Sequence, residues 1–258
     1  RQSLLYGYPS MSRSTSAAAR EPAHHFISKS TLRSTVHKLA GVAFAAGLSL
    51  FAAPSFAQQA AVEAPLSAQE QEVIDWLSDK EDEMVALLER LTNINTGTLN
   101  KAGVAEVITM LSAELRELGF TSRALPGDVI EMPSCPGSEY QIDVADHLLA
   151  SKQGSGKRLL MIGHVDTVFP LDSPFQRFSR EGDTAFGPGV SDMKGGLVVM
   201  LYALKALNEF GQLEDKAISL MLNSDEEIGS LSSRKYIEEQ APLHDYGLVY
   251  ESSGNNRL

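Results

Sequence analysis

Hydrophobic positions change their spacing along the chain, and the change predicts helices first and alternating strands and helices later. Residues 67–70 form a capping-box pattern, and apolar residues then recur at mostly helical spacing through residues 72–94. Another helix is expected from Val104 to Leu118 and ends before Gly119.

Two continuous apolar runs follow, at residues 158–168 (RLLMIGHVDTV) and 217–227 (AISLMLNSDEE). Runs of this kind are typical of strands buried on both faces. A further strand is expected at residues 246–253, and helices are expected at residues 195–207 and 232–240. This alternation predicts an α/β fold with an open, mostly parallel sheet and helices on both faces.

The beginning of the chain has the pattern of an export signal. Basic residues precede an apolar run at residues 39–57, which ends with Ser55 and Ala57 at the −3 and −1 positions of a cleavage site. A membrane anchor is the rival interpretation, but the run is short for a span and interrupted by glycine and proline. We expect residues 1–57 to be a signal peptide with upstream residues and residues 58–66 to be a linker. The location expected is the bacterial periplasm or the exterior, with no stable membrane anchor after cleavage.

Charge and cysteine content exclude several classes of partner and site. The formal net charge of −11 argues against a nucleic-acid partner, because such binding needs a basic face. The single cysteine, Cys135, excludes an internal disulfide and a cysteine-based zinc cage. It lies in a loop rich in proline and glycine, and we expect no chemical role for it.

Each predicted core strand ends in polar residues of the metal-binding or acid–base type. In open parallel sheets, ligands bind outside the carboxyl ends of the strands, so these side chains are expected to converge. They are His164 and Asp166 at the end of the first strand, Asp225, Glu226 and Glu227 at the end of the second, and Glu251 at the end of the third.

The stretch GHVDTV places two of these side chains on one face. Residues two apart in a strand project the same way, so His164 and Asp166 are expected to lie together. Imidazole is a good zinc ligand, and a neighbouring carboxylate can orient its ring. A surface histidine beside an acid is the alternative interpretation.

The stretch GPGVSDMKGG presents Asp192 from a glycine-rich loop before a helix. Glycine permits positive φ and close backbone approach, which would bring a short carboxylate into a crowded site. Asp192 could instead be a helix N-cap, although that role does not explain the surrounding glycines. A phosphate-binding loop is a further alternative, but neither of the usual glycine motifs is present.

The stretch NSDEEIGS ends a predicted strand with three adjacent acids, which repel one another unless they are solvated or bind cations. In an extended backbone Glu226 and Glu227 would point in opposite directions and so serve different purposes. A solvated turn is the alternative.

Together, GHVDTV, GPGVSDMKGG, NSDEEIGS and YES resemble, in this order, the motifs of the co-catalytic zinc peptidases. That family includes glutamate carboxypeptidase, aminoacylase and succinyl-diaminopimelate desuccinylase, and the chain is most similar to the exported carboxypeptidase G group. The resemblance covers roughly residues 67–258, which it identifies as the N-terminal portion of the catalytic domain.

The resemblance implies a ligand set for two Zn²⁺ ions, with Co²⁺ or Mn²⁺ as alternatives. His164 would bind one ion, Asp192 would bridge both, Glu227 would bind the other, and Glu251 would share the ion held by His164. It also implies a cis peptide bond after Asp192.

The resemblance further implies that Asp166 orients the His164 ring and that Glu226 is the general base in hydrolysis of a peptide or amide bond. The expected substrate is a small peptide, from which a C-terminal amino acid is removed, or an N-acyl amino acid in a deacylase of the same family. A non-catalytic remnant that binds metal or ligand is the alternative from another class.

Family members have a lid or dimerisation domain and a later histidine ligand, which would follow the part of the catalytic domain that this chain resembles. His244 lies outside every motif and is not assigned as that ligand, and His147 is expected at the surface. The resemblance therefore implies that the complete protein is an active hydrolase able to form a homodimer through that domain. This chain alone is expected to be weak or inactive.

Overall fold

The structure is a computed structural model that describes residues 65–132 and 140–252. The expected signal segment, most of the expected linker and Cys135 lie outside these residues. Within the described ranges, no helix combines the length and apolar character needed to cross a membrane.

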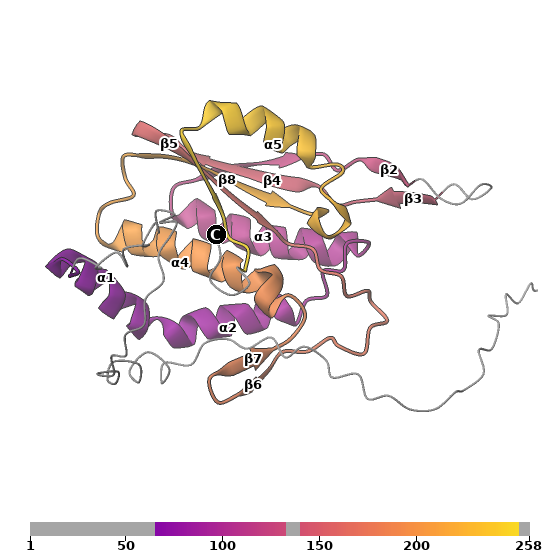
Figure 1. Cartoon of the computed structure of the whole chain (residues 1–258), viewed down its shortest axis with the longest axis horizontal. Helices are drawn as coiled ribbons and strands as arrows, with labels where there is room; N and C mark the ends of the chain where they lie inside the picture. Colours follow the sequence, from indigo (N-terminus) through magenta and orange to yellow (C-terminus); the bar gives the residue numbers. More distant parts are fainter. Residues whose placement is uncertain (1–64, 133–139, 253–258) are drawn as a thin grey trace, which may run out of the picture. The chain divides into compact units, whose positions relative to one another are not determined.

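A five-stranded sheet forms the centre of the fold, with the strand order β1-β4-β8-β5-β9 (Figure 1). Strand β5 is parallel to β8 and β9, while β4 is antiparallel to both β1 and β8. Four strands, β1, β8, β5 and β9, therefore run in one direction. The mostly parallel α/β fold is confirmed, with β4 as the reversed strand. The strands are β1 (Thr121–Leu125), β4 (His147–Lys152), β8 (Lys216–Asn223), β5 (Ser155–His164) and β9 (Tyr246–Val249).

Two short antiparallel pairs lie outside this sheet. They are β2 (Val129–Met132) with β3 (Tyr140–Asp143), and β6 (Ser179–Glu181) with β7 (Thr184–Phe186).

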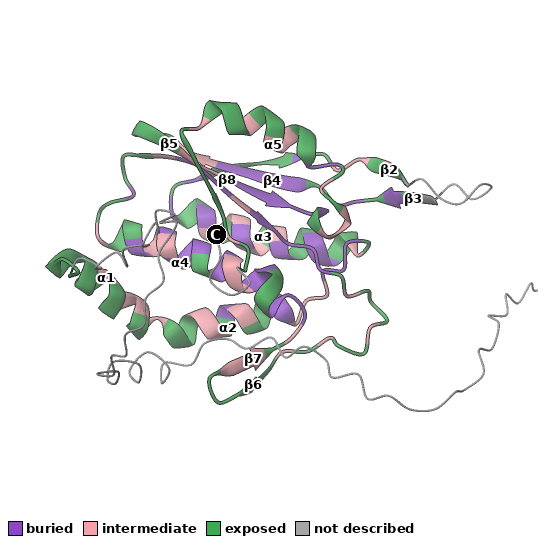
Figure 2. Cartoon of the chain, viewed as in Figure 1, coloured by how far each residue is buried: buried purple, intermediate pink, exposed green. Residues whose placement is uncertain are grey.

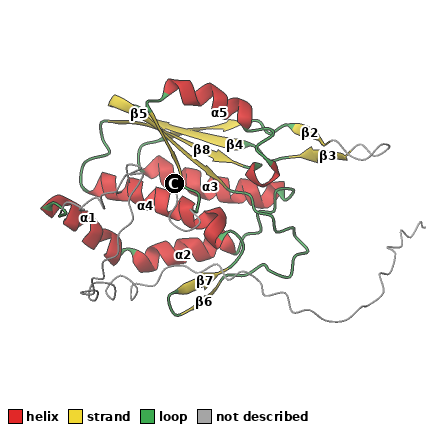
Figure 3. Ribbon diagram, in the orientation of Figure 1, coloured by secondary structure: helices red, strands yellow, loops and turns green. Residues whose placement is uncertain are grey.

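Helices cover both faces of the central sheet, as Figure 3 shows. One face carries the main core, where apolar residues of α2, α3 and α4 pack against the sheet. On the other face, Tyr236 and Ile237 of α5 pack against Leu125, Leu149 and Met221. Figure 2 shows the buried strands β4 and β8 between these layers. The helices are α1 (Ala68–Asp79), α2 (Glu81–Thr92), α3 (Lys101–Glu117), α4 (Gly195–Glu209) and α5 (Arg234–Gln240).

Several predicted boundaries need correction. The capping box at Ser67 is present, but the helical pattern of residues 72–94 divides at Lys80, whose ψ near 0° separates α1 from α2. A run of acids at the start of α2 suits a new helix N-terminus there. The three core strands end earlier than predicted, at His164, Asn223 and Val249, so the motif residues that follow lie in turns.

Candidate metal centre

His164 is the last residue of β5, and its imidazole is buried. Its Nδ1 lies 3.0 Å from the backbone oxygen of Asp166 and 3.3 Å from the Asp166 carboxylate. A hydrogen on Nδ1 can therefore be donated to Asp166, which leaves Nε2 facing the other acids. The backbone N–H of His164 also meets the sulfur of Met193 at 3.0 Å.

Asp192 lies in an irregular turn, Val190–Lys194, immediately before α4. The turn starts after Gly189, whose φ of 78° is a conformation that suits glycine. The Asp192–Met193 peptide bond is cis, as the resemblance implied. The Asp192 carboxylate is 59% exposed, and its Oδ1 lies 2.9 Å from Nε2 of His164.

Lys194 anchors this turn in the interior of the protein. Its side chain is fully buried, and Nζ donates hydrogen bonds of 3.0 Å to the backbone oxygens of Leu91 and Ile94 at the end of α2. Burial lowers the pKa of Lys194 to about 8. The lysine therefore ties the segment that carries Asp192 to a different helix.

Glu226 and Glu227 follow β8 in a 3₁₀ turn, Glu226–Ile228, rather than in an extended strand. The expected opposite orientation in an extended backbone does not apply. Instead, the backbone N–H groups of both residues donate to the Asp166 carboxylate, at 3.1 and 3.2 Å. Asp166, which is fully buried, thus holds this turn beside His164.

Glu251 follows β9, and its Oε1 lies 3.0 Å from Nε2 of His164. The segment approaches the start of α4 closely, since a Cβ added to Gly196 would lie 2.1 Å from the backbone oxygen of Tyr250. This glycine lets the chain before Glu251 pass beside the turn that carries Asp192.

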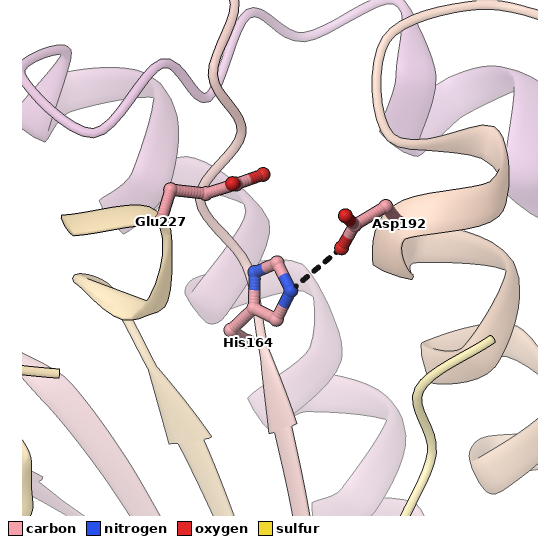
Figure 4. Close-up of side chains that lie close together, drawn as sticks. All are labelled: His164, Asp192 and Glu227. Carbon is pink, nitrogen blue, oxygen red and sulfur yellow. Dashed lines mark hydrogen bonds and ion pairs between the residues drawn. The ribbon is translucent and has the colours of Figure 1, made fainter. Parts of the chain in front are cut away.

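The ligand-type atoms of His164, Asp192 and Glu227 all lie within 4.8 Å of one another. Figure 4 shows the two carboxylates on either side of the His164 ring. Glu251 meets the same imidazole nitrogen, and Oε2 of Glu226 lies 3.7 Å from it. The structure thus brings six of the expected residues together: His164, Asp166, Asp192, Glu226, Glu227 and Glu251. Asp225 does not join them, because its carboxylate accepts hydrogen bonds from the backbone N–H groups of Ser232 and Ser233.

Electrostatics concentrate negative charge at this point. Burial by itself lowers the pKa of His164, but the hydrogen bond to Asp166 and the carboxylates around the ring raise it to about 9. Burial and the neighbouring Asp192 raise the pKa of Glu227 to about 7, and the same two causes raise the pKa of Glu251. All three shifts favour the protonated forms, as expected where several acids surround one imidazole.

The donor set fits a divalent metal ion. One imidazole nitrogen and several carboxylate oxygens are ligands that Zn²⁺, Co²⁺ and Mn²⁺ accept. The ligands come from the end of β5, from the segments after β8 and β9, and from the turn before α4. This agrees with the expected position of a site in such a sheet.

Three residues that support this cluster were missed by the sequence analysis. Thr98 donates a hydrogen bond of 2.8 Å from its hydroxyl to Asp166, and Lys194 holds the Asp192 turn. His147, which was expected at the surface, is 1% exposed, so that expectation was wrong. None of them stands next to a partner in sequence, although Lys194 lies within a motif that could have drawn attention to it. His244 contacts the backbone oxygen of Gln240, in keeping with its exclusion from the ligand set.

Comparison with known proteins supports the resemblance. Residues 160–257 match the model of peptidase family M20/M25/M40, and this range includes all six predicted site residues. The chain is therefore similar to this family of metallopeptidases over the part that forms the site.

Among curated proteins, the chain is similar to carboxypeptidase G2 of Pseudomonas sp. (strain RS-16), with 38% identity over 189 residues, 70% of this chain and 42% of that protein. It is 29% identical over 160 residues to succinyl-diaminopimelate desuccinylase of Gluconacetobacter diazotrophicus, which covers 58% of this chain and 38% of that protein. Human carnosine dipeptidase 1 shares the fold, with a TM-score of 0.57 and 17% identity over 71% of this chain and 41% of that chain. The chain thus spans less than half the length of each of these relatives.

Proposed function

We propose that the chain provides metal ligands and the general base of a hydrolase that cleaves peptide or amide bonds. The observation that carries this proposal is the meeting of His164, Asp192 and Glu227 within 4.8 Å. These residues lie far apart in the sequence, and a cluster of mutually repelling acids around one imidazole has a direct purpose if it binds cations.

In this proposal His164, Asp192, Glu227 and Glu251 hold two Zn²⁺ ions, with Asp192 as the bridge. Bound zinc would supply Lewis acidity and lower the pKa of a water molecule at neutral pH. The short contacts of Asp192 and Glu251 with the same nitrogen of His164 support a shared ion for these three residues.

Asp166 and Glu226 have different tasks from the ligands. Asp166 keeps the hydrogen of His164 on Nδ1 and so directs Nε2 at the cluster, which is the usual role of a carboxylate behind a ligating histidine. The Glu226 side chain is 46% exposed, so water and substrate can reach its carboxylate. As general base, Glu226 takes a proton from the attacking water and passes it to the leaving nitrogen.

The substrate proposed is a small peptide from which a C-terminal amino acid is removed, supported by the 38% identity to carboxypeptidase G2. Deacylation of an N-acyl amino acid is the second candidate, because the chain is also 29% identical over 160 residues to a succinyl-diaminopimelate desuccinylase. Both reactions break an amide bond beside a carboxylate-bearing residue, so the same ligands and base would serve either.

The domain division remains part of this proposal: a signal at residues 1–57, a linker at residues 58–66 and a catalytic portion at residues 67–258. The small-residue cleavage pattern after the apolar run supports export to the periplasm or the exterior. The homodimer through a later domain rests on the family resemblance.

Zinc binding tests the site directly. Calorimetric titration of the metal-free chain should show zinc binding, and Asp192→Asn and Glu227→Gln should each weaken it by about tenfold or more. Glu238→Gln is the matched control, since Glu238 is an exposed glutamate of α5 outside the cluster. Equal zinc affinity in all four proteins would contradict the ligand assignment.

Hydrolysis tests the base, using the protein expressed from its complete gene with N-acylglutamate and succinylated substrates. Glu226→Gln should lower kcat by about 10²–10⁴-fold, while zinc affinity changes little, because Glu226 is not a ligand in the proposal. Unchanged turnover in this variant would reject the assignment. The ratio of activities on the two substrates separates the two candidate functions.

A further inference from the structure

Glu226 and Glu227 of the DEE motif (residues 225–227) are presented by a loop that runs from Ser224, after β8, to Ser233, before α5. Within the loop, Oδ2 of Asp225 accepts hydrogen bonds from the backbone N–H groups of Ser232, at 2.6 Å, and Ser233, at 3.2 Å. Ser224, Asp225, Ser232 and Ser233 are fully buried. The loop therefore has a buried base, from which Glu226 and Glu227 extend towards His164.

His147, the first residue of β4, lies between the two ends of this loop. Its Nδ1 lies 3.1 Å from the backbone nitrogen of Ser224 and 2.8 Å from the Ser224 hydroxyl oxygen. Its Nε2 lies 3.1 Å from the hydroxyl oxygen of Ser232. Because β4 is antiparallel to β8, the start of β4 is beside the end of β8, where the loop begins.

The contacts determine the tautomer of this histidine. A backbone N–H can only donate, so Nδ1 of His147 must accept from Ser224, and the ring hydrogen must be on Nε2. That hydrogen is donated to Ser232, whose hydroxyl oxygen also accepts the backbone N–H of Asp128. Burial lowers the pKa of His147, which agrees with a neutral ring.

A nucleophilic serine site does not fit the same residues. Ser224 and Ser232 are fully buried, and the Ser224 hydroxyl donates to the backbone oxygen of Ala145. Oδ2 of Asp225 accepts from loop backbone, and no hydrogen bond joins Asp225 to the His147 ring among the described residues. The contacts join segments of backbone instead of activating a hydroxyl.

We propose that His147 is a positioning residue of the metal centre, whose neutral imidazole joins both ends of the loop that presents Glu226 and Glu227. The inference rests on the proposed metal-dependent function, since it assigns a purpose to the fixed position of these acids. His147 lies outside the ligand cluster and acts through the backbone of Ser224 and the side chain of Ser232. This positioning role explains why an imidazole, with an acceptor and a donor on opposite sides of one rigid ring, occupies this buried position.

Three substitutions separate the two contacts. In His147→Asn, the amide oxygen can take the place of Nδ1 but does not reach Ser232. In His147→Gln, the amide nitrogen can take the place of Nε2 and keep the Ser232 contact. His147→Phe fills the space and removes both contacts. Leu115→Ala, in the core on the other side of the sheet, is the control for a general loss of stability.

The measurement uses Co²⁺ added to the metal-free chain, with the visible absorption of bound cobalt giving both affinity and ligand geometry. We expect His147→Phe to lower Co²⁺ affinity about tenfold or more and to alter the absorption bands. His147→Asn and His147→Gln should lose less affinity than His147→Phe. Leu115→Ala should keep wild-type affinity and bands at a temperature where it is folded.

The outcomes distinguish this inference from the proposed function. If wild-type chain binds cobalt and His147→Phe binds it equally well with the same bands, His147 does not position the site. The inference is equally wrong if Leu115→Ala loses as much affinity as His147→Phe. If the wild-type chain binds no cobalt, the metal centre itself is wrong, and the inference fails with it.

A second measurement does not require a variant to fold. Nitrogen-15 NMR of the wild-type protein should show His147 neutral with its hydrogen on Nε2. A hydrogen on Nδ1 would be incompatible with acceptance from the Ser224 backbone and would overturn the inference.

Discussion

Replacing Thr98 by valine removes one hydroxyl and keeps the β-branched shape of the side chain. That hydroxyl donates a 2.8 Å hydrogen bond to Oδ2 of Asp166, and both residues are buried, at 7% and 0% exposure. Asp166 keeps the backbone N–H donors of Glu226 and Glu227. Its carboxylate therefore loses one of the three hydrogen bonds that it accepts from Thr98, Glu226 and Glu227. The effect of Thr98→Val is therefore that of a single charge-assisted hydrogen bond.

Hydrogen bonds to charged groups contribute about 1.5–3 kcal/mol, so we expect Thr98→Val to lower the free energy of unfolding by about 2 kcal/mol. For a chain of this size, the midpoint of thermal unfolding should fall by about 4–8 °C. Urea denaturation of the metal-free protein measures the change, with an unchanged dependence on denaturant showing that the unfolded state is the same. Zinc affinity should fall as well, because Asp166 holds both His164 and the turn of Glu226.

Thr96→Val is the matched control in the same loop. The Thr96 hydroxyl oxygen is also buried but has no hydrogen-bond partner among the described residues. Its replacement should change stability by less than about 0.5 kcal/mol or increase it, because an unpaired buried polar atom is removed. If Thr98→Val and Thr96→Val have the same effect on stability, the hydrogen bond to Asp166 does not hold the site as described.

Three further predictions concern the surroundings of the cluster. Lys194→Met should lower the free energy of unfolding, measured by urea denaturation, by about 2 kcal/mol, because two backbone carbonyls lose their hydrogen-bond donor. Removal of a desolvated charge offsets part of this loss. An unchanged urea midpoint would contradict the prediction. Gly196→Ala should lower the free energy of unfolding by about 1–3 kcal/mol and weaken zinc binding, because the added Cβ would displace the segment of Glu251. Gly247→Ala should do neither, because an added Cβ there meets nothing within 4 Å. Because burial lowers the pKa of His147, its neutral form is favoured in the folded state, so its contribution to stability is complete above about pH 6.5 and is lost as the pH falls below that value. The difference in unfolding free energy between wild type and His147→Asn should accordingly shrink as the pH is lowered from 7 to 5. A constant difference would contradict a neutral His147 in the folded state.

The ligand-type residues could be predicted because their positions follow from local pattern. His164 ends β5, Glu227 and Glu251 come shortly after β8 and β9, and parallel strands bring such ends to one edge of the sheet. Asp192 was indicated by its glycines, and Gly189 and Gly196 do have a positive φ and a close backbone approach, respectively. The chemistry of the side chains then limited the site to metal binding or acid–base work.

The supporting residues could not be predicted, because each depends on a partner distant in sequence. Thr98 and Asp166 are 68 residues apart, His147 and Ser224 are 77 apart, and Lys194 and Leu91 are 103 apart. A lone buried histidine or threonine has no periodic pattern to mark it, and the same residue types are common on surfaces.

The sequence by itself determined the alternation of strands and helices and the residues at the strand ends, because periodicity and side-chain chemistry are local properties. Only the tertiary structure decided that β4 enters the sheet in the reverse direction between β1 and β8, which places His147 beside the loop of Glu226 and Glu227. It also decided that the DEE motif lies in a turn held by Asp166. The physical reason is that buried polar groups must find hydrogen-bond partners wherever the packed sheet puts them, and the order of strands in a sheet is independent of their order in the chain.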